Sequence, residues 1–239
     1  MINEQAPVYI AEPSEAFFFD KPKLGIGFVP NGACTNECIF CEPNIPAMEK
    51  QNPETPHRAP RKYTVTEYTS RVMELLDRRP EIDEIVITGI IGEPLLFLDN
   101  LTELLASLKK RSALPIRLNT NGQASVITNQ KSEEVAQRLK QAGLDKVAIS
   151  VNAVSENDYN QLCRPKLQGA YDNVIEFIRA SKAAGLNIAL SFVDYSKYRQ
   201  DWPAIKKEEV YRFAEQFGLT KDDVIFRPYI TDEKPITKN

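Results

Sequence analysis

The sequence predicts an α/β fold in which short parallel strands alternate with helices along one chain. Short apolar runs are each followed by a segment whose apolar residues recur at helical spacing. Three of these helical segments end in a glycine followed by an apolar residue, at Gly143, Gly185 and Gly218. Repeated strand–helix–strand units of this kind cross over right-handed and build a parallel sheet. A length of 239 residues suits a single domain.

Six strands are expected, and their nearly continuous apolar character suits a sheet covered on both faces. They are residues 24–29, 85–88, 116–119, 147–151, 188–193 and 224–226. The first helix is expected to begin at Thr64, because Thr64 and Glu67 have the spacing of a capping box. Asn100 is the expected cap of the next helix, and Ser132 opens another that runs to Ala142.

Two architectures fit this order of elements: an open doubly wound sheet and an incomplete (β/α) barrel. The number of strands does not choose between them. In both, functional side chains gather where strands end and helices begin. The residues just after each strand are therefore the candidates for a site.

The composition indicates a globular protein with a real core. Hydrophobic residues make up 42% of the chain and charged residues 26%, which excludes wholesale disorder. The net charge of −3 argues against a nucleic-acid partner without ruling one out, and no apolar run is long enough to cross a membrane. No secretory signal is visible at the N-terminus, so a cytoplasmic protein is expected.

One segment, residues 43–62, has no apolar period and is rich in proline. Its prolines are Pro43, Pro46, Pro53, Pro56 and Pro60. Because proline fixes φ, the segment is expected to be a partly extended loop. Loops of this length in compact domains are either functional or disordered.

The strongest signal follows the first expected strand, where Cys34, Cys38 and Cys41 have the spacing C-x3-C-x2-C. Three thiolates can hold three irons of a [4Fe–4S] cluster and leave the fourth iron free to bind a ligand. The alternative is a zinc site, which needs a fourth ligand such as His57 or Cys163. No second group of cysteines is present, so auxiliary iron–sulfur centres are not expected.

The cysteine motif, with an aromatic residue before its last cysteine, resembles that of the radical S-adenosylmethionine (SAM) superfamily. Residues 88–94, with the sequence TGIIGEP, are similar to the GGEP element of that superfamily. Residues 118–123 (LNTNGQ), 150–153 (SVNA) and 162–165 (LCRP) make the chain similar to the small TatD-associated radical SAM proteins. The resemblance covers 24–230, flanked by an N-terminal extension (1–23) and a C-terminal tail (231–239). It departs from the subgroup in the 43–62 loop.

The resemblance implies a single-domain partial (β/α)6 barrel of the TIM type. It implies that Cys34, Cys38 and Cys41 ligate a [4Fe–4S] cluster whose open iron binds SAM. It also implies a set of cofactor contacts. These are Phe40 against the adenine, the turn Gly92, Glu93 and Pro94 at the methionine amino group, and Asn119, Asn121, Ser150 and Asn152 at the ribose and carboxylate. Arg227 is a candidate on other grounds, because it lies at the end of the last expected strand, where it either binds SAM or substrate or closes the rim of the barrel.

The implied activity is reductive cleavage of SAM to methionine and a 5′-deoxyadenosyl radical, which abstracts hydrogen from a small-molecule or macromolecular substrate that no motif identifies. A flavodoxin or ferredoxin is the expected electron donor, and the 43–62 loop is a candidate lid. The same chemistry would serve a glycyl-radical enzyme activase. A non-catalytic iron–sulfur or zinc protein is the alternative from another class.

Overall fold

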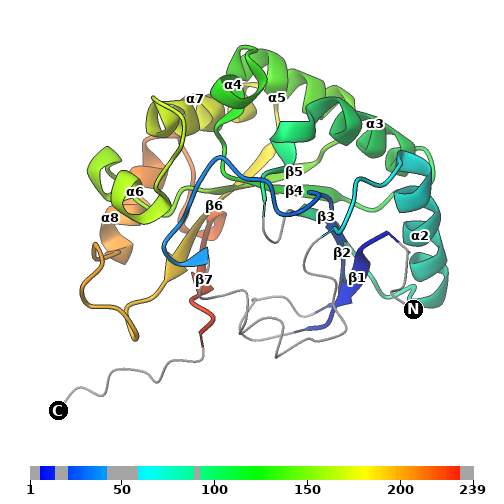
Figure 1. The fold of residues 1–239 in the computed structure, drawn as a ribbon, viewed down its shortest axis with the longest axis horizontal. Helices are drawn as coiled ribbons and strands as arrows, with labels where there is room; N and C mark the ends of the chain where they lie inside the picture. Colours follow the sequence, from blue (N-terminus) through cyan, green and yellow to red (C-terminus); the bar gives the residue numbers. More distant parts are fainter. Residues whose placement is uncertain (1–5, 14–20, 42–58, 89–91, 232–239) are drawn as a thin grey trace.

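The computed structural model describes residues 6–13, 21–41, 59–88 and 92–231. Within them, seven strands form one sheet in the order β1-β2-β3-β4-β5-β6-β7 (Figure 1). Neighbouring strands from β2 to β7 are parallel, as the repeated strand–helix units predict. The strands are β1 (Val8–Ala11), β2 (Lys23–Gly27), β3 (Ile85–Thr88), β4 (Ile116–Thr120), β5 (Lys146–Ser150), β6 (Asn187–Asp194) and β7 (Val224–Pro228).

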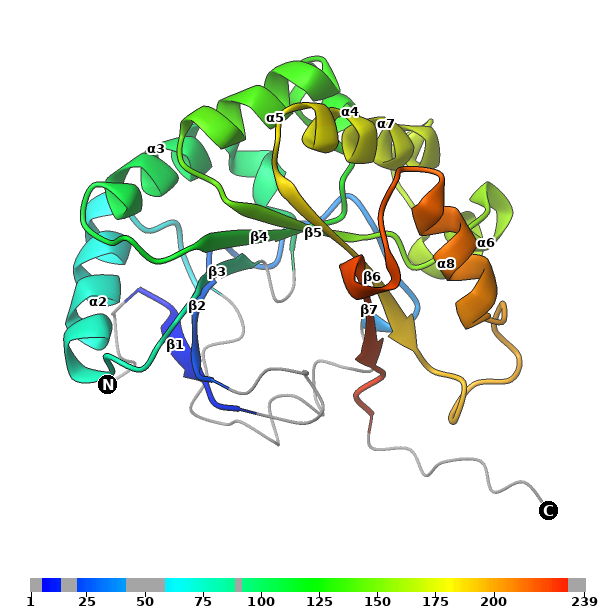
Figure 2. The same cartoon turned by 180° about the vertical axis from the view of Figure 1, so that it is seen from behind.

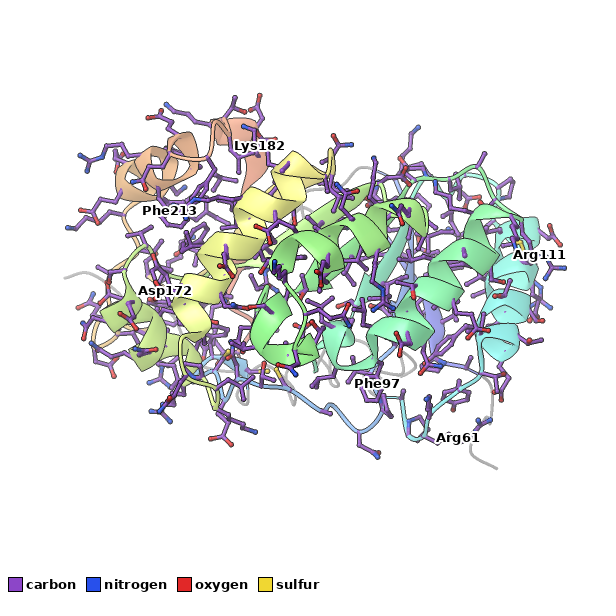
Figure 3. All side chains as sticks on the ribbon, turned by 90° about the horizontal axis from the view of Figure 1, so that it is seen from above. Arg61, Phe97, Arg111, Asp172, Lys182 and Phe213 are labelled. Carbon is purple, nitrogen blue, oxygen red and sulfur yellow. The ribbon has the colours of Figure 1, made fainter. Side chains whose placement is uncertain are left out.

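The helices lie along the convex side of the curved sheet and leave its other side without a helical layer among the described residues (Figure 2). They are α2 (Val65–Arg78), α3 (Leu98–Lys109), α4 (Ala124–Thr128), α5 (Ser132–Gln141), α6 (Glu156–Cys163), α7 (Ala170–Ala183) and α8 (Lys207–Glu215), with 3-10 turns η2 (Pro94–Phe97) and η3 (Lys221–Asp223). Seen from above, α3, α5 and α7 lie side by side over the sheet (Figure 3). This arrangement confirms the predicted partial TIM-type barrel.

Strand β1 is an element that the sequence did not predict. It lies in the segment expected to be an extension and pairs antiparallel with β2, Tyr9 opposite Gly25. A β-carbon at Gly25 would lie 2.3 Å from the Tyr9 ring, so the tyrosine occupies space that only glycine leaves. A strand of four residues with one tight contact is too short to stand out as a pattern. Most of the 43–62 loop lies outside the described residues.

Helix α2 starts with the predicted capping box, in which the Thr64 hydroxyl accepts from Glu67 N–H and the Glu67 carboxylate accepts from Thr64 N–H. The prediction that Asn100 caps α3 is wrong, because Asn100 lies inside that helix. The chain enters α3 through η2, which the Glu93 side chain caps by accepting from Leu95 N–H at 2.8 Å. Proline at the first position of η2 has no N–H that would need a partner.

The two faces of the sheet differ in the side chains that they carry, although residues on both are buried. Residues that point toward the helices, such as Ile87, Leu118 and Leu190, are completely buried and apolar. The alternate residues of β4 to β7 point to the concave face and are largely polar or small. They include Arg117, Asn119, Lys146, Ala148, Ser150, Ala189, Ser191 and Arg227, while Val193 and Ile225 are apolar members of the same face. No helix of the described residues is long and apolar enough to span a membrane.

Candidate active site at the carboxyl edge of the sheet

The cysteine loop begins where β2 ends and carries Cys34, Cys38 and Cys41, all partly exposed. Asn31 and Gly32 precede it with φ of 53° and 69°, and this left-handed pair turns the chain sharply at the edge of the sheet. Within the loop, Asn36 N–H donates to the Cys34 sulfur at 3.5 Å. The parallel topology therefore brings three thiols to the edge where the functional residues were expected.

A second segment, residues 162–166, holds the cysteine loop by its backbone. Glu37 N–H donates to Cys163 O at 3.1 Å, and Ile39 N–H donates to Leu162 O at 3.0 Å. The last contact runs the other way, from Lys166 N–H to Thr35 O at 2.8 Å. These bonds anchor the loop to the C-terminal end of α6. Sequence analysis missed this pairing, because nothing in the loop signals a partner more than 120 residues away.

The surroundings of two of the thiols, Cys34 and Cys38, favour the protonated form over the thiolate. Burial raises the pKa of Cys34 to about 12, and a hydrogen bond with Cys163 is the main reason that the pKa of Cys38 lies well above its usual range. Cys163 itself is completely buried. Since only thiolates ligate iron or zinc, metal binding at this loop must release protons.

The two candidate metal groups, a zinc ion and an iron–sulfur cluster, place different demands on the thiols. No three His, Cys, Asp or Glu side chains of the described residues are arranged to hold one ion. A zinc ion would draw each sulfur to about 2.3 Å from one point, whereas each thiolate of an iron–sulfur cluster binds a different iron. His57, one of the two ligands that would complete a zinc site, lies outside the described residues.

Glu93 is buried beside the cysteine loop, at 1% exposure. Its carboxylate accepts from Leu95 N–H at 2.8 Å, from the Thr120 hydroxyl at 2.7 Å and from Asn121 N–H at 2.6 Å. Burial raises the pKa of Glu93 to about 7, and these three donors offset part of the rise. Its own N–H donates to Ala33 O at 2.8 Å, so Glu93 ties the loop to the end of β4.

The turn before Glu93 also depends on close packing. Gly92 has a φ of +125°, and a β-carbon there would lie 2.6 Å from the Val29 side chain. Any other residue at this position would be strained and would collide with the strand end. Pro94, which follows, is buried at the start of η2.

Asn119 on β4 and Asn121 in the turn after it face different parts of the site. Asn119 faces the concave side, and its side-chain oxygen accepts from Arg117 at 2.9 Å. Asn121 instead turns to the cysteine loop, donating to the Thr35 hydroxyl at 2.8 Å and accepting from Gln123 N–H at 3.0 Å. The expected pair is therefore divided between the concave face and the loop.

Ser150, Asn152 and Arg227 meet near the ends of β5 and β7. The Ser150 hydroxyl lies 3.4 Å from the Ser191 hydroxyl and 3.5 Å from an Arg227 terminal nitrogen. Asn152 has a φ of 60° and is 3% exposed, and its amide nitrogen faces Ser150 O and the Cys163 sulfur. Its side-chain oxygen and Arg227 Nε are buried without a hydrogen-bond partner among the described residues. Burial also lowers the pKa of Arg227.

Unsatisfied buried polar atoms of this kind are costly unless a ligand pairs with them. A molecule with both hydrogen-bond donors and acceptors, such as the amino-acid and ribose parts of SAM, fits Asn152 and Arg227. Phe40 differs, because its ring is 6% exposed and packs in the hydrophobic core. It therefore presents little surface to an adenine in this structure.

Comparison with known proteins agrees with this geometry. The family model described as the radical SAM superfamily matches residues 28–211, which is more than half of the chain. A probable GTP 3′,8-cyclase of Saccharolobus solfataricus is 28% identical over 198 residues, covering 82% of this chain and 54% of the relative. One of Saccharolobus islandicus is 26% identical over the same coverage. The chain thus spans about half the length of these curated relatives.

Two solved structures have the same fold at low sequence identity. Methylornithine synthase (PylB) superposes with a TM-score of 0.59 at 15% identity, covering 88% of this chain and 54% of that one. The anSMEcpe structure with bound AdoMet and Kp18Cys peptide has a TM-score of 0.59 at 15% identity, covering 88% of this chain and 52% of that one. With the family match over most of the barrel, the chain belongs to the radical SAM superfamily and is an enzyme whose cofactors are a [4Fe–4S] cluster and SAM.

Proposed function

We propose that this enzyme cleaves SAM reductively and uses the product radical on a substrate held at the concave face of the sheet. The observation that carries the proposal is the loop of three thiols at the carboxyl edge, next to buried polar atoms that have no hydrogen-bond partner in the described part of the chain. When bound, the cluster and SAM supply one-electron cleavage of the sulfonium C–S bond, giving methionine and a 5′-deoxyadenosyl radical that abstracts hydrogen.

The chain's own residues have three tasks in this scheme. Cys34, Cys38 and Cys41 hold the cluster, and their number leaves one iron for SAM. Asn152 and Arg227 offer a free acceptor and a free donor, which suit the amino and carboxylate groups of the methionine part. The Gly92 turn keeps backbone close to the loop without a side chain in the way.

The remaining expected contacts are part of the same proposal. Ser150 and Asn119 offer hydroxyl and amide groups on the concave face, where ribose hydroxyls would lie. Electrons are expected from a flavodoxin or ferredoxin, and the 43–62 segment remains a candidate lid. The closer similarity to the TatD-associated subgroup stays a prediction.

The test is anaerobic reconstitution with iron and sulfide, followed by dithionite and SAM. We expect about four irons per chain, an EPR signal of the reduced cluster that changes when SAM is added, and formation of 5′-deoxyadenosine. Cys34→Ala should lose the cluster signal and the product. Glu103→Ala, an exposed change on α3 far along the chain from the motif, is the control and should keep both.

Three results would contradict the proposal. They are a protein that holds one zinc instead of iron, a cluster that does not respond to SAM, and an intact cluster without 5′-deoxyadenosine. A stable radical on an added partner polypeptide would instead identify the activase variant of the same chemistry.

GTP is the first substrate to test, because the sequence relatives at 26% to 28% identity are named GTP 3′,8-cyclases. The matched region covers 54% of the length of those relatives, so the match does not assign their complete activity to this chain. Faster 5′-deoxyadenosine formation with GTP, together with a changed nucleotide, would support GTP. An unchanged rate and intact GTP would exclude it.

A further inference from the structure

A buried group of three polar side chains, here the Gln123 network, joins three separate segments beneath the cysteine loop. Gln123 Nε2 donates to Asn36 Oδ1 at 2.6 Å and to the Tyr159 hydroxyl at 2.8 Å. Asn36 Nδ2 also donates to that hydroxyl, at 3.3 Å. Gln123 follows β4, Tyr159 lies on α6, and Asn36 lies between Cys34 and Cys38.

The network is shut off from solvent. Gln123 and Tyr159 have no exposed surface, and Asn36 is 8% exposed. The Gln123 side-chain oxygen has no hydrogen-bond partner among the described residues, which costs free energy in a buried site. An apolar side chain of the same size would avoid that cost, so packing alone does not account for a glutamine here.

Asn36 connects the Gln123 network to the cysteines of the loop. Its side chain makes both network contacts, and its N–H donates to the Cys34 sulfur at 3.5 Å. The backbone pairing of the loop with residues 162–166 holds the following residue, Glu37, from the α6 side. The network therefore acts on the segment between two of the three thiols.

We propose that Gln123 and Tyr159 are positioning residues that fix Asn36, and through it the separation of Cys34 and Cys38. The inference rests on the proposed function only in that these cysteines carry the cluster. Neither residue is required to touch SAM or substrate. Their effect is on how firmly the cluster is held and on the geometry around its irons.

The informative variant is Gln123→Met, which keeps the length of the side chain and removes both hydrogen bonds and the unpaired oxygen. The unfolding midpoint of the metal-free protein should fall only modestly, because Asn36 Oδ1 loses its donor while the unsatisfied Gln123 oxygen is removed as well. The reconstituted protein should lose iron to a chelator about fivefold faster, the factor that one ordinary hydrogen bond gives. Its reduced cluster should also give an altered EPR spectrum.

Tyr159→Phe is the second variant, because it keeps the ring that packs at 5.4 Å from Tyr171 and removes only the hydroxyl. It should show the same faster iron loss and altered EPR spectrum. Tyr171→Phe and the exposed Gln141→Met are the matched controls and should behave as wild type.

The inference is overturned if both variants release iron at the wild-type rate with unchanged EPR spectra. It is equally overturned if iron loss changes only in proportion to the unfolding midpoint of the metal-free protein, because the network would then be structural alone. Failure of the proposed function would look different. The wild type itself would bind no cluster or form no 5′-deoxyadenosine.

Discussion

Replacing Glu93 by glutamine tests the hydrogen-bond account of the loop anchor. Both carboxylate oxygens of Glu93 accept hydrogen bonds, from Leu95 N–H, the Thr120 hydroxyl and Asn121 N–H. Glutamine has one acceptor oxygen, so its amide nitrogen must face a donor. If that oxygen stays with Asn121, Leu95 N–H loses its acceptor in a buried place, at a cost of about 1–3 kcal/mol.

The same substitution has a pH dependence of defined sign. Burial raises the pKa of Glu93 to about 7 from 4.5, so the folded protein binds the proton more tightly than the unfolded chain does. The stabilising contribution is present below pH 4.5 and is lost as the pH rises through 7. The change from 4.5 to about 7 corresponds to about 3 kcal/mol, at about 1.36 kcal/mol per pKa unit.

The assay is denaturant unfolding of the reduced, metal-free protein at about pH 5 and about pH 8. Between these values the free energy of unfolding of wild type should fall by about 2–3 kcal/mol relative to Glu93→Gln, which cannot ionise. Glu103→Gln, an exposed change on α3, controls for the loss of one negative charge. A wild-type to Glu93→Gln difference that is equal at both pH values would refute the reasoning.

Three further predictions concern the barrel and the cofactor. Gly25→Val should destabilise the protein by about 1–3 kcal/mol, because its side chain collides with the Tyr9 ring, and Tyr9→Ala should restore part of the loss in denaturant unfolding. Leu118→Ala, at a position with no exposed surface, should cost about 2–5 kcal/mol in the same assay, and a smaller loss would mean that the core closes around it. Arg227→Gln should weaken SAM binding to the reconstituted enzyme about tenfold by calorimetry, and an unchanged affinity would remove Arg227 from the cofactor site.

The alternation of strands and helices and the cysteine motif could be predicted because both are local signals, whereas the choice of a barrel over an open sheet came from the resemblance to the radical SAM superfamily. Apolar runs such as 85–88 and 147–151 predict strands without knowledge of their neighbours, and the spacing of three cysteines is read within eight residues. Strand β1 was not predicted, because an alternation of apolar and polar residues cannot be recognised over only four residues. The start of α3 was misplaced because Asn100 has the side chain of a cap, while a proline six residues earlier had already started the turn.

The concave face and the loop anchors could not be predicted, because they depend on contacts between distant segments. Polar residues such as Arg117 and Asn119 alternate with apolar ones in β4, and which face of the sheet they take follows from the register of the assembled sheet. Gln123 and Asn36 meet across 87 residues of chain, and neither is an unusual residue in its own segment. Composition and periodicity carry no information about contacts between residues that are far apart in the sequence.

The polar residues at the carboxyl edge fall into two groups, those whose side chains already have hydrogen-bond partners and those with an unpaired buried atom among the described residues. Glu93 and Asn121 resemble ligand-binding residues in sequence, yet their side chains are already engaged with η2, the end of β4 and the cysteine loop. Asn152 and Arg227 each have a buried polar atom that no other described residue pairs with. A ligand gains most from the second group, because pairing those atoms removes a cost that the protein already bears. Substitutions in the first group should therefore act through the loop and its cluster, and those in the second through SAM affinity.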